Sequence, residues 1–486
     1  MSNTKSIQSI SLISLSTIVL LAFSVVIMSQ PVIVSGMECL FLLPLSCAIC
    51  TFVFQSAILK TYRKFPFLCL YLVLFVRYVV APLFMSMNNI CQFMNCNKES
   101  YFFAIIVMMV ELFSIFIAIN HFYRNTNYKD DEKTEVELNF ERERYYAPLS
   151  IIGIIFIVAL IVLVWMRGHL QNVFDHLSIL NTQNYSDDEL FNYDFDVVIA
   201  IKTLIALQII FLGYRISRRS NGKFLFVLLS VGGALLNIFI YDSTARSNLL
   251  CTAFATVLLL SRLFPQYKKP IILSVIGGVI ILIFGLVLNS NFWWAQGDAH
   301  NIISGYGLKR LALTFESYTN NVSTIAWGFS NYQNARQIIG LDNYFAEFFG
   351  NFGFFAWPGL RTIREVFTGG ALHITNIFRE MINYHAIIPS SIHGVWMFGP
   401  VFGTIFDVLF YWYLIKSIKY VNDKRNSQNN IYYYYWLLLI EWTLALGPIY
   451  NLWILLYSIT GGKLIMIIVF AVCGLERKIV IKSNRK

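Results

Sequence analysis

Long apolar runs separated by short polar turns dominate this chain. Runs near the length needed to cross a ~30 Å hydrocarbon core predict about twelve transmembrane helices. They cover 8–28, 38–58, 66–86, 101–121, 147–166, 197–214, 224–241, 248–264, 270–290, 394–415, 431–450 and 452–474. The segment 291–393 is too polar to cross a bilayer and too aromatic for a plain linker, so it is expected to fold as a cap over a site. The pattern predicts an all-α polytopic integral membrane protein with one large extracytoplasmic loop.

Three regions follow from this pattern. Residues 1–290 would hold transmembrane helices 1–9, and 291–393 would form the large loop with the substrate and catalytic cap. Residues 394–486 would hold helices 10–12 and a cytoplasmic C-terminus. Whether 337–357 dips into the membrane as a re-entrant segment stays open.

Composition excludes a soluble protein. Hydrophobic residues make up 57% of the chain and charged residues 13%, and the mean hydropathy is +0.61. The net charge of +10 does not indicate nucleic acid, because most Lys and Arg fall in alternate short loops and act as an orientation signal. By the positive-inside rule both termini are cytoplasmic and 291–393 lies outside.

The eight cysteines are scattered, without the spacing of metal ligands. Cys91 and Cys96 share one predicted outer loop. A disulfide in an oxidising compartment and two free thiols are both open for this pair.

Ionisable side chains inside predicted spans are costly and are functional candidates by default. Arg77 and Glu111 lie near the middle of neighbouring spans and are expected to pair, either as a structural ion pair or as the lining of a cavity. Lys202 and Lys463 lie closer to span ends, where snorkelling accounts for them. Asp407 and Glu441 have no explanation from the sequence.

Arginines on the outer side point to an anionic substrate. Arg246 lies in a very short outer turn, and a guanidinium suits phosphate because its planar donors stay charged. Lys309-Arg310 opens an amphipathic stretch, and Arg361 and Arg364 share one helical face at i, i+3 spacing. The competing interpretations are a headgroup-snorkelling Arg246 and surface charges paired with Asp342, Glu347 and Glu365.

Two histidines flank a Pro turn at the mouth of a predicted span. His385 and His393 stand on either side of Pro389. Histidine is the usual general base near neutral pH, so both are candidate catalytic residues. The alternative for each is a plain hydrogen-bonding group at the membrane interface.

These features together resemble the Wzy-type polymerases of O-antigen and capsular polysaccharide. The layout of the whole chain, with many spans and one large outer loop before the last few helices, is similar to that family. Two short motifs add to the likeness: the turn ending in Ser243-Thr244-Ala245-Arg246-Ser247, and the Gly-rich entry to a span at Gly394, Phe398-Gly399 and Phe402-Gly403.

The resemblance implies a metal-independent membrane glycosyltransferase of GT-C-like fold, without a cofactor, at the outer face of the cytoplasmic (inner) membrane. It would join polyprenyl-diphosphate-linked oligosaccharide repeat units into a surface polysaccharide. Arg246, with Arg310, Arg361 and Arg364, would bind the diphosphate, and His385 or His393 would act as base. The partners implied are the lipid-linked oligosaccharides, the bilayer, a chain-length regulator and a flippase.

Three other classes compete with this interpretation. A lipid-linked oligosaccharide flippase or exporter also has roughly twelve spans, but it usually has two similar halves and lacks a long outer segment. An O-antigen ligase shares the layout of the polymerase, and these residues do not separate the two. A membrane acyltransferase would use a His at the membrane edge, but no donor site for an acyl group is evident.

Overall fold

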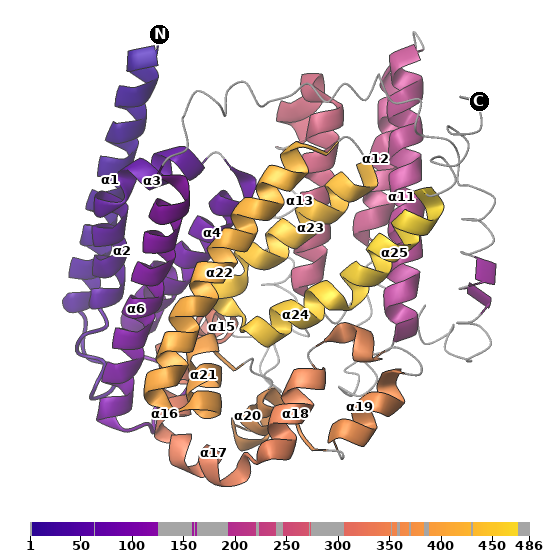
Figure 1. The fold of residues 1–486 in the computed structure, drawn as a ribbon. Helices are drawn as coiled ribbons and strands as arrows, with labels where there is room; N and C mark the ends of the chain where they lie inside the picture. Colours follow the sequence, from indigo (N-terminus) through magenta and orange to yellow (C-terminus); the bar gives the residue numbers. More distant parts are fainter. Residues whose placement is uncertain are drawn as a thin grey trace.

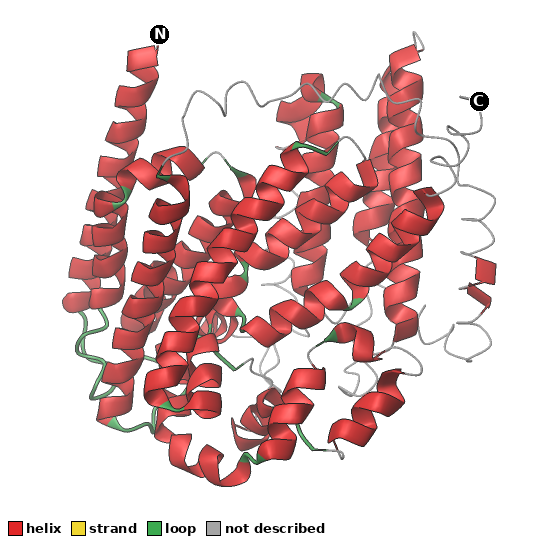
Figure 2. Ribbon diagram, in the orientation of Figure 1, coloured by secondary structure: helices red, strands yellow, loops and turns green. Residues whose placement is uncertain are grey.

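A computed structural model describes most of the chain as a bundle of helices (Figure 1). The described residues are 2–62, 64–124, 158–159, 161–162, 193–219, 223–239, 246–271, 273, 306–350, 352–356, 360–368, 371–382, 388–428 and 431–474. Within these ranges every regular element is a helix and there is no strand (Figure 2).

The helices fall into four groups along the chain. The first contains α1 (Ser2–Met28), α2 (Leu42–Val53), α3 (Gln55–Thr61), α4 (Phe65–Phe75), η1 (Val76–Val80), α5 (Ala81–Asn88) and α6 (Lys98–Tyr123). The second contains α11 (Tyr193–Arg219), α12 (Lys223–Phe239), α13 (Arg246–Leu263) and η3 (Pro265–Tyr267). The third contains α15 (Tyr306–Thr319), α16 (Val322–Ser330), α17 (Tyr332–Ile338), α18 (Leu341–Gly350), η6 (Gly353–Ala356), α19 (Leu360–Thr368), α20 (Ile374–Ile382) and α21 (Ser390–Phe398). The fourth contains α22 (Pro400–Asn426), α23 (Ile431–Ala445), η7 (Gly447–Ile449), α24 (Leu452–Thr460) and α25 (Gly462–Gly474).

The described residues contain several helices that suit a membrane. Four are long and apolar enough to cross one: Phe65–Asn88, Lys98–Tyr123, Pro400–Asn426 and Leu452–Val472. The pair α2 and α3 would make a fifth, bent by 79° at its break. Shorter apolar helices cover Ile13–Met28, Val198–Tyr214, Val227–Ile238 and Cys251–Leu263. A helical membrane protein is thus supported, while the predicted spans 147–166 and 270–290 fall almost entirely outside the described residues.

The predicted span 394–415 is wrong at its start. Gly399 adopts φ +84°, a left-handed conformation that ends α21, and Pro400 then begins α22. The two helices fold back on each other, so closely that a Cβ on Gly403 would lie 2.4 Å from the carbonyl carbon of Gly394. The Gly-rich motif therefore builds a tight helical hairpin at the mouth of the span.

The helices from α16 to α21 gather at one end of the bundle, and we call them the cap. In Figure 1 they lie below the long helices, while α1 begins and α3 lies at the opposite end. The segment 337–357, for which the sequence leaves re-entry into the membrane open, contributes α18 and η6 to the cap. Its Gly353 amide donates to Thr460 Oγ1 at the end of α24 over 2.8 Å.

Asparagine side chains tie the cap to the spans where helices break. Asn321 is the N-cap of α16 and donates from Nδ2 to the backbone carbonyl of Arg77 over 2.7 Å. Asn320 donates to the carbonyl of Ile449 over 2.7 Å, and Asn451 donates to the carbonyl of Ile388 over 3.1 Å. Backbone groups at helix ends need such partners when buried, so each amide stabilises one junction.

Candidate functional site

A buried carboxylate and a histidine face each other between two helices of the cap. Nε2 of His393, on α21, lies 3.0 Å from Oε1 of Glu347, on α18. The side chains are 1% and 0% exposed. The structure thus brings His393, a predicted base, to a carboxylate. The interpretation of Glu347 as a paired surface charge is wrong, because α18 packs this face into the cap.

The second oxygen of Glu347 is also engaged. Oε2 accepts a hydrogen bond from the backbone amide of Ile374, which begins α20, over 2.6 Å. The same oxygen lies 4.0 Å from Nδ1 of His373, whose side chain is 27% exposed. Gly350 lies against the His373 ring, where a Cβ would come within 1.5 Å of Cε1. These contacts hold the carboxylate in one orientation and connect it to a half-exposed histidine.

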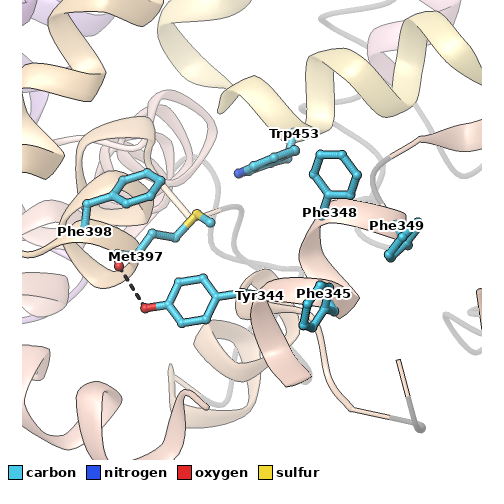
Figure 3. A pocket seen from close by; sticks show the side chains of 7 residues that line it. All are labelled: Tyr344, Phe345, Phe348, Phe349, Met397, Phe398 and Trp453. Carbon is cyan, nitrogen blue, oxygen red and sulfur yellow. Dashed lines mark hydrogen bonds between the residues drawn. The ribbon is translucent and has the colours of Figure 1, made fainter. Parts of the chain in front are cut away.

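An aromatic cavity of about 470 Å³ lies next to this pair: Trp453, which the His393 ring contacts, lines the cavity, while Glu347 and His393 themselves do not. Figure 3 shows the side chains that line it: Tyr344, Phe345, Phe348, Phe349, Met397, Phe398 and Trp453. Most come from α18 and from α21, while Trp453 belongs to α24 in the span Leu452–Val472. The cavity therefore lies where the cap meets the membrane-spanning part.

Helical spacing connects the pair to the cavity. Met397 follows His393 by one turn of α21, and Tyr344 precedes Glu347 by about one turn of α18. The Tyr344 hydroxyl donates to the carbonyl of Met397 over 2.8 Å, so it closes this side of the cavity (Figure 3). The His393 ring lies edge-on to Trp453 with 6.0 Å between ring centroids.

This arrangement suits proton transfer beside a flat, partly apolar ligand. An ionised Glu347 accepts the hydrogen on Nε2 of His393, which leaves Nδ1 as the proton acceptor. A carboxylate that orients the imidazole also stabilises the imidazolium formed after proton uptake. Aromatic faces like those of Trp453 and Phe348 offer stacking surfaces.

Most of the other predicted site residues stay predictions. His385 lies outside the described residues, as do the side chains of Arg246, Arg310, Arg361 and Arg364. The backbone places Arg246 at the first turn of α13 and Arg310 in α15. Arg361 and Arg364 belong to α19, which packs against α18 and so lies next to the helix that carries Glu347.

The predicted pair of Arg77 and Glu111 is confirmed. Nη2 of Arg77 lies 2.7 Å from Oε2 of Glu111, and the two side chains are 1% and 0% exposed. The Tyr78 hydroxyl donates to the same carboxylate oxygen over 3.1 Å. Arg77 Nη1 also donates to the carbonyl of Pro448 in η7. The pair is thus at least a structural link between two spans and the broken helix α23–η7–α24.

Two other predictions about ionisable residues need correction or completion. Lys202 does not snorkel: it is 8% exposed and donates to the carbonyl of Asn237 over 2.9 Å. Glu441 has a partner in Arg425, whose Nε lies 2.8 Å away. Arg425 lies in the last turn of α22 and is buried there.

Of the two alternatives for Cys91 and Cys96, a disulfide or two free thiols, the structure has the free thiols. Cys91 and Cys96 are both free in the structure. Burial raises the pKa of the Cys91 thiol to about 12, so this sulfur is a poor nucleophile near neutral pH.

Sequence reasoning missed Glu347, His373 and Trp453 as parts of the site. One signal was available for Glu347, which stands alone in the run Tyr344-Phe345-Ala346-Glu347-Phe348-Phe349. A single carboxylate in an aromatic helix must be exposed or paired when that helix is buried. Trp453 had no signal, since its role depends on which span the cap covers.

The chain matches no protein-family model, no curated protein and no solved structure.

Proposed function

We propose that this chain is a membrane glycosyltransferase that polymerises polyprenyl-diphosphate-linked oligosaccharide repeat units into a surface polysaccharide. The observation that carries the proposal is the buried Glu347–His393 pair beside an aromatic cavity at the junction of cap and span. A general base next to stacking surfaces, close to the membrane, is what transfer between lipid-linked sugars requires.

In the proposed reaction a hydroxyl of one repeat unit attacks the anomeric carbon of the lipid-linked chain. The new C–O bond forms as the bond from the anomeric carbon to the diphosphate oxygen breaks, and the electron pair leaves with polyprenyl diphosphate. Nδ1 of His393 takes the hydroxyl proton, and Glu347 stabilises the resulting imidazolium at 3.0 Å.

The departing diphosphate gains negative charge, which needs cationic donors. Arg246, Arg310, Arg361 and Arg364 remain the proposed donors. The packing of α19 on α18 supports Arg361 and Arg364 most, because it brings their helix beside that of Glu347. The proposed site faces the outside of the cytoplasmic membrane, with both termini in the cytoplasm.

The test is the length profile of surface polysaccharide in a strain that lacks this protein. The strain is complemented with wild type, His393→Gln, Glu347→Gln or the control His121→Gln, with protein levels matched by immunoblot. His121 is an exposed histidine on α6 that stacks on Trp412, away from the cap. Wild type and His121→Gln should restore a ladder, and the two site variants should leave a single repeat unit.

Two outcomes would overturn the proposal. A full ladder from both His393→Gln and Glu347→Gln would remove this pair from the chemistry. Loss of even the single unit in the deletion strain, with lipid-linked units retained in the cytoplasmic leaflet, would instead indicate a flippase.

A further inference from the structure

Three spans bring three ionisable side chains together in the interior of the bundle. Arg77 comes from Phe65–Asn88, Glu111 from Lys98–Tyr123 and Asp407 from Pro400–Asn426. Their exposed fractions are 1%, 1% and 2%. Asp407 interacts electrostatically with both Glu111 and Arg77.

The charges in this cluster do not balance. One guanidinium faces two carboxyl groups, so with all three ionised the cluster carries one negative charge in excess. Arg77 uses Nη2 on Glu111 and Nη1 on the Pro448 carbonyl. An uncompensated carboxylate inside a membrane-spanning bundle is strongly unfavourable. The cluster therefore needs one more positive charge.

Oxygen atoms without a well-aligned hydrogen bond lie around the two carboxyl groups. Among the described residues, Glu111 Oε1, Asp407 Oδ1, the Tyr411 hydroxyl and Ser390 Oγ are all buried and lack a hydrogen bond of good geometry. Ser390 and Glu111 nevertheless lie close enough to Asp407 to interact with its carboxyl group. Tyr411 is one turn after Asp407 on α22 and lies in the field of both carboxyl groups. Ser390 adjoins Asp407 and begins α21. Buried polar oxygens of this kind are expected to be satisfied by water or by a bound ion.

We propose that Glu111 and Asp407 together bind one monovalent cation, either a proton or Na⁺, in the interior of the membrane-spanning bundle. A single positive charge restores neutrality, whereas a divalent ion would leave an excess of one positive charge beside Arg77. The oxygens of Tyr411 and Ser390 complete a hard-oxygen environment for it. The remaining polar groups that face the site are Arg77 and Tyr78.

The bound cation would act on the cap. Ser390 is the first residue of α21, the helix that carries His393. The backbone carbonyl of Arg77 accepts from Asn321, the N-cap of α16. Occupation of the site thus stabilises both connections between the spans and the cap. This inference does not depend on the proposed glycosyl transfer.

The test uses the full chain purified into lipid nanodiscs. Dicyclohexylcarbodiimide reacts with protonated carboxyl groups in apolar surroundings, and the labelled residue is identified by mass spectrometry. The melting temperature is measured in parallel across pH at fixed Na⁺ and across Na⁺ at fixed pH. The variants are Asp407→Asn, Glu111→Gln and Tyr411→Phe, with Glu441→Gln as a control from the charge-balanced pair with Arg425.

For a bound proton we expect labelling of Glu111 or Asp407 that does not depend on Na⁺. Above the midpoint of its pH dependence, the labelling should fall about tenfold per pH unit. For bound Na⁺ we expect added Na⁺ to suppress labelling and to raise the melting temperature by mass action. In either case Asp407→Asn should abolish the dependence, and Glu441→Gln should keep it. Tyr411→Phe should weaken it and serves as the milder variant if Asp407→Asn or Glu111→Gln does not fold.

The proposal is overturned by one combined result. In that result wild type would show no labelling of either carboxyl group from acidic to alkaline pH. The melting temperatures of wild type and Tyr411→Phe would also depend on pH and on Na⁺ to the same extent.

These experiments do not test whether the chain makes polysaccharide, because no step of glycosyl transfer is measured.

Discussion

Glu347 in the cap and Glu111 in the spans are both buried carboxylates held by a basic side chain at hydrogen-bond distance. The partner distances are 3.0 Å for Glu347 and His393 and 2.7 Å for Glu111 and Arg77. Arginine stays charged under all physiological conditions, whereas histidine gains and loses a proton near neutral pH. Nearly the same geometry therefore joins a carboxylate to a permanent cation in one region and to a residue type that can serve as a general base in the other.

The surroundings of the two carboxylates also differ: Glu111 lies in closely packed helices, and Glu347 lies near a cavity. Arg77 also holds the Pro448 carbonyl, so Glu111 takes part in the packing of three segments. The Glu347–His393 pair lies behind Trp453, which lines a cavity of about 470 Å³. The comparison teaches that burial and a short ion-pair distance alone do not single out a candidate site, whereas a histidine partner next to a cavity does.

The largest effect is expected from His393→Gln on the proposed polymerisation. Gln keeps a hydrogen-bond donor for Glu347 but cannot accept a proton as a base, so the rate should fall by about 10²–10⁴. Chain extension with lipid-linked repeat units in proteoliposomes measures it, with His121→Gln as the matched control. A rate near that of wild type would show that His393 is not the base, and the contrast between Glu347 and Glu111 would then have no functional meaning.

Arg77→Ala should have the largest effect on stability. It leaves Glu111 buried without its cation, which is expected to cost about 3–5 kcal/mol. Thermal unfolding in nanodiscs measures the loss. The double variant with Glu111→Ala should be less destabilised than the sum of the two single variants, because the partners are coupled. Strict additivity would contradict the ion pair.

Glu316 extends the comparison to a buried carboxylate bound by a backbone amide. Its Oε2 accepts from the Gln92 amide over 2.7 Å, and burial raises its pKa from 4.5 to about 7. Between pH 4.5 and 7 the folded state therefore binds a proton that the unfolded state has lost. The contribution of Glu316 to stability is fully present below pH 4.5 and is lost as pH rises through this range.

Glu316→Gln removes that charge and keeps an acceptor for the Gln92 amide. It should raise stability by roughly 1–3 kcal/mol at pH 8 and flatten the dependence between pH 4.5 and 7. Melting temperatures measured from pH 4 to pH 8 check this. An unchanged slope in the variant would show that Glu316 does not titrate in this range.

Gly403→Ala tests how the hairpin positions His393. The added methyl would meet the backbone of Gly394, which follows His393, and overpacking of this kind costs about 1–3 kcal/mol. Gly232→Ala is the control, since a methyl added there would meet no atom within 4 Å. Activity should fall with Gly403→Ala and stay with Gly232→Ala, whereas equal melting temperatures for both would contradict the close packing.

The smallest effect is expected at an exposed pair. Lys98 and Glu38 lie 3.6 Å apart, with side chains 67% and 46% exposed. Lys98→Ala should change stability by less than about 1 kcal/mol, and added salt should remove the difference. A loss of stability as large as that expected for Arg77→Ala would mean that burial does not make the Arg77–Glu111 pair stronger than the exposed Lys98–Glu38 pair.

The sequence by itself determined the helical membrane class, the Arg77–Glu111 pair and the candidacy of His393. Each rests on a local property: the length of an apolar run, a charge in the middle of a span, or a histidine at the mouth of one. The number of spans is determined only in part, because the described helices support four to five by length and composition.

Tertiary structure alone decided the other contacts between side chains of different helices. Glu347, interpreted from the sequence as a surface charge, is the buried partner of His393, and Lys202 is buried instead of snorkelling. Trp453 lines the cavity. The hairpin at Gly399 also moved the start of the span, through a positive φ that the Gly-rich motif permits but does not require. The physical reason is the same throughout: a partner across two helices depends on how their faces pack, and the order of residues along one helix does not specify the other.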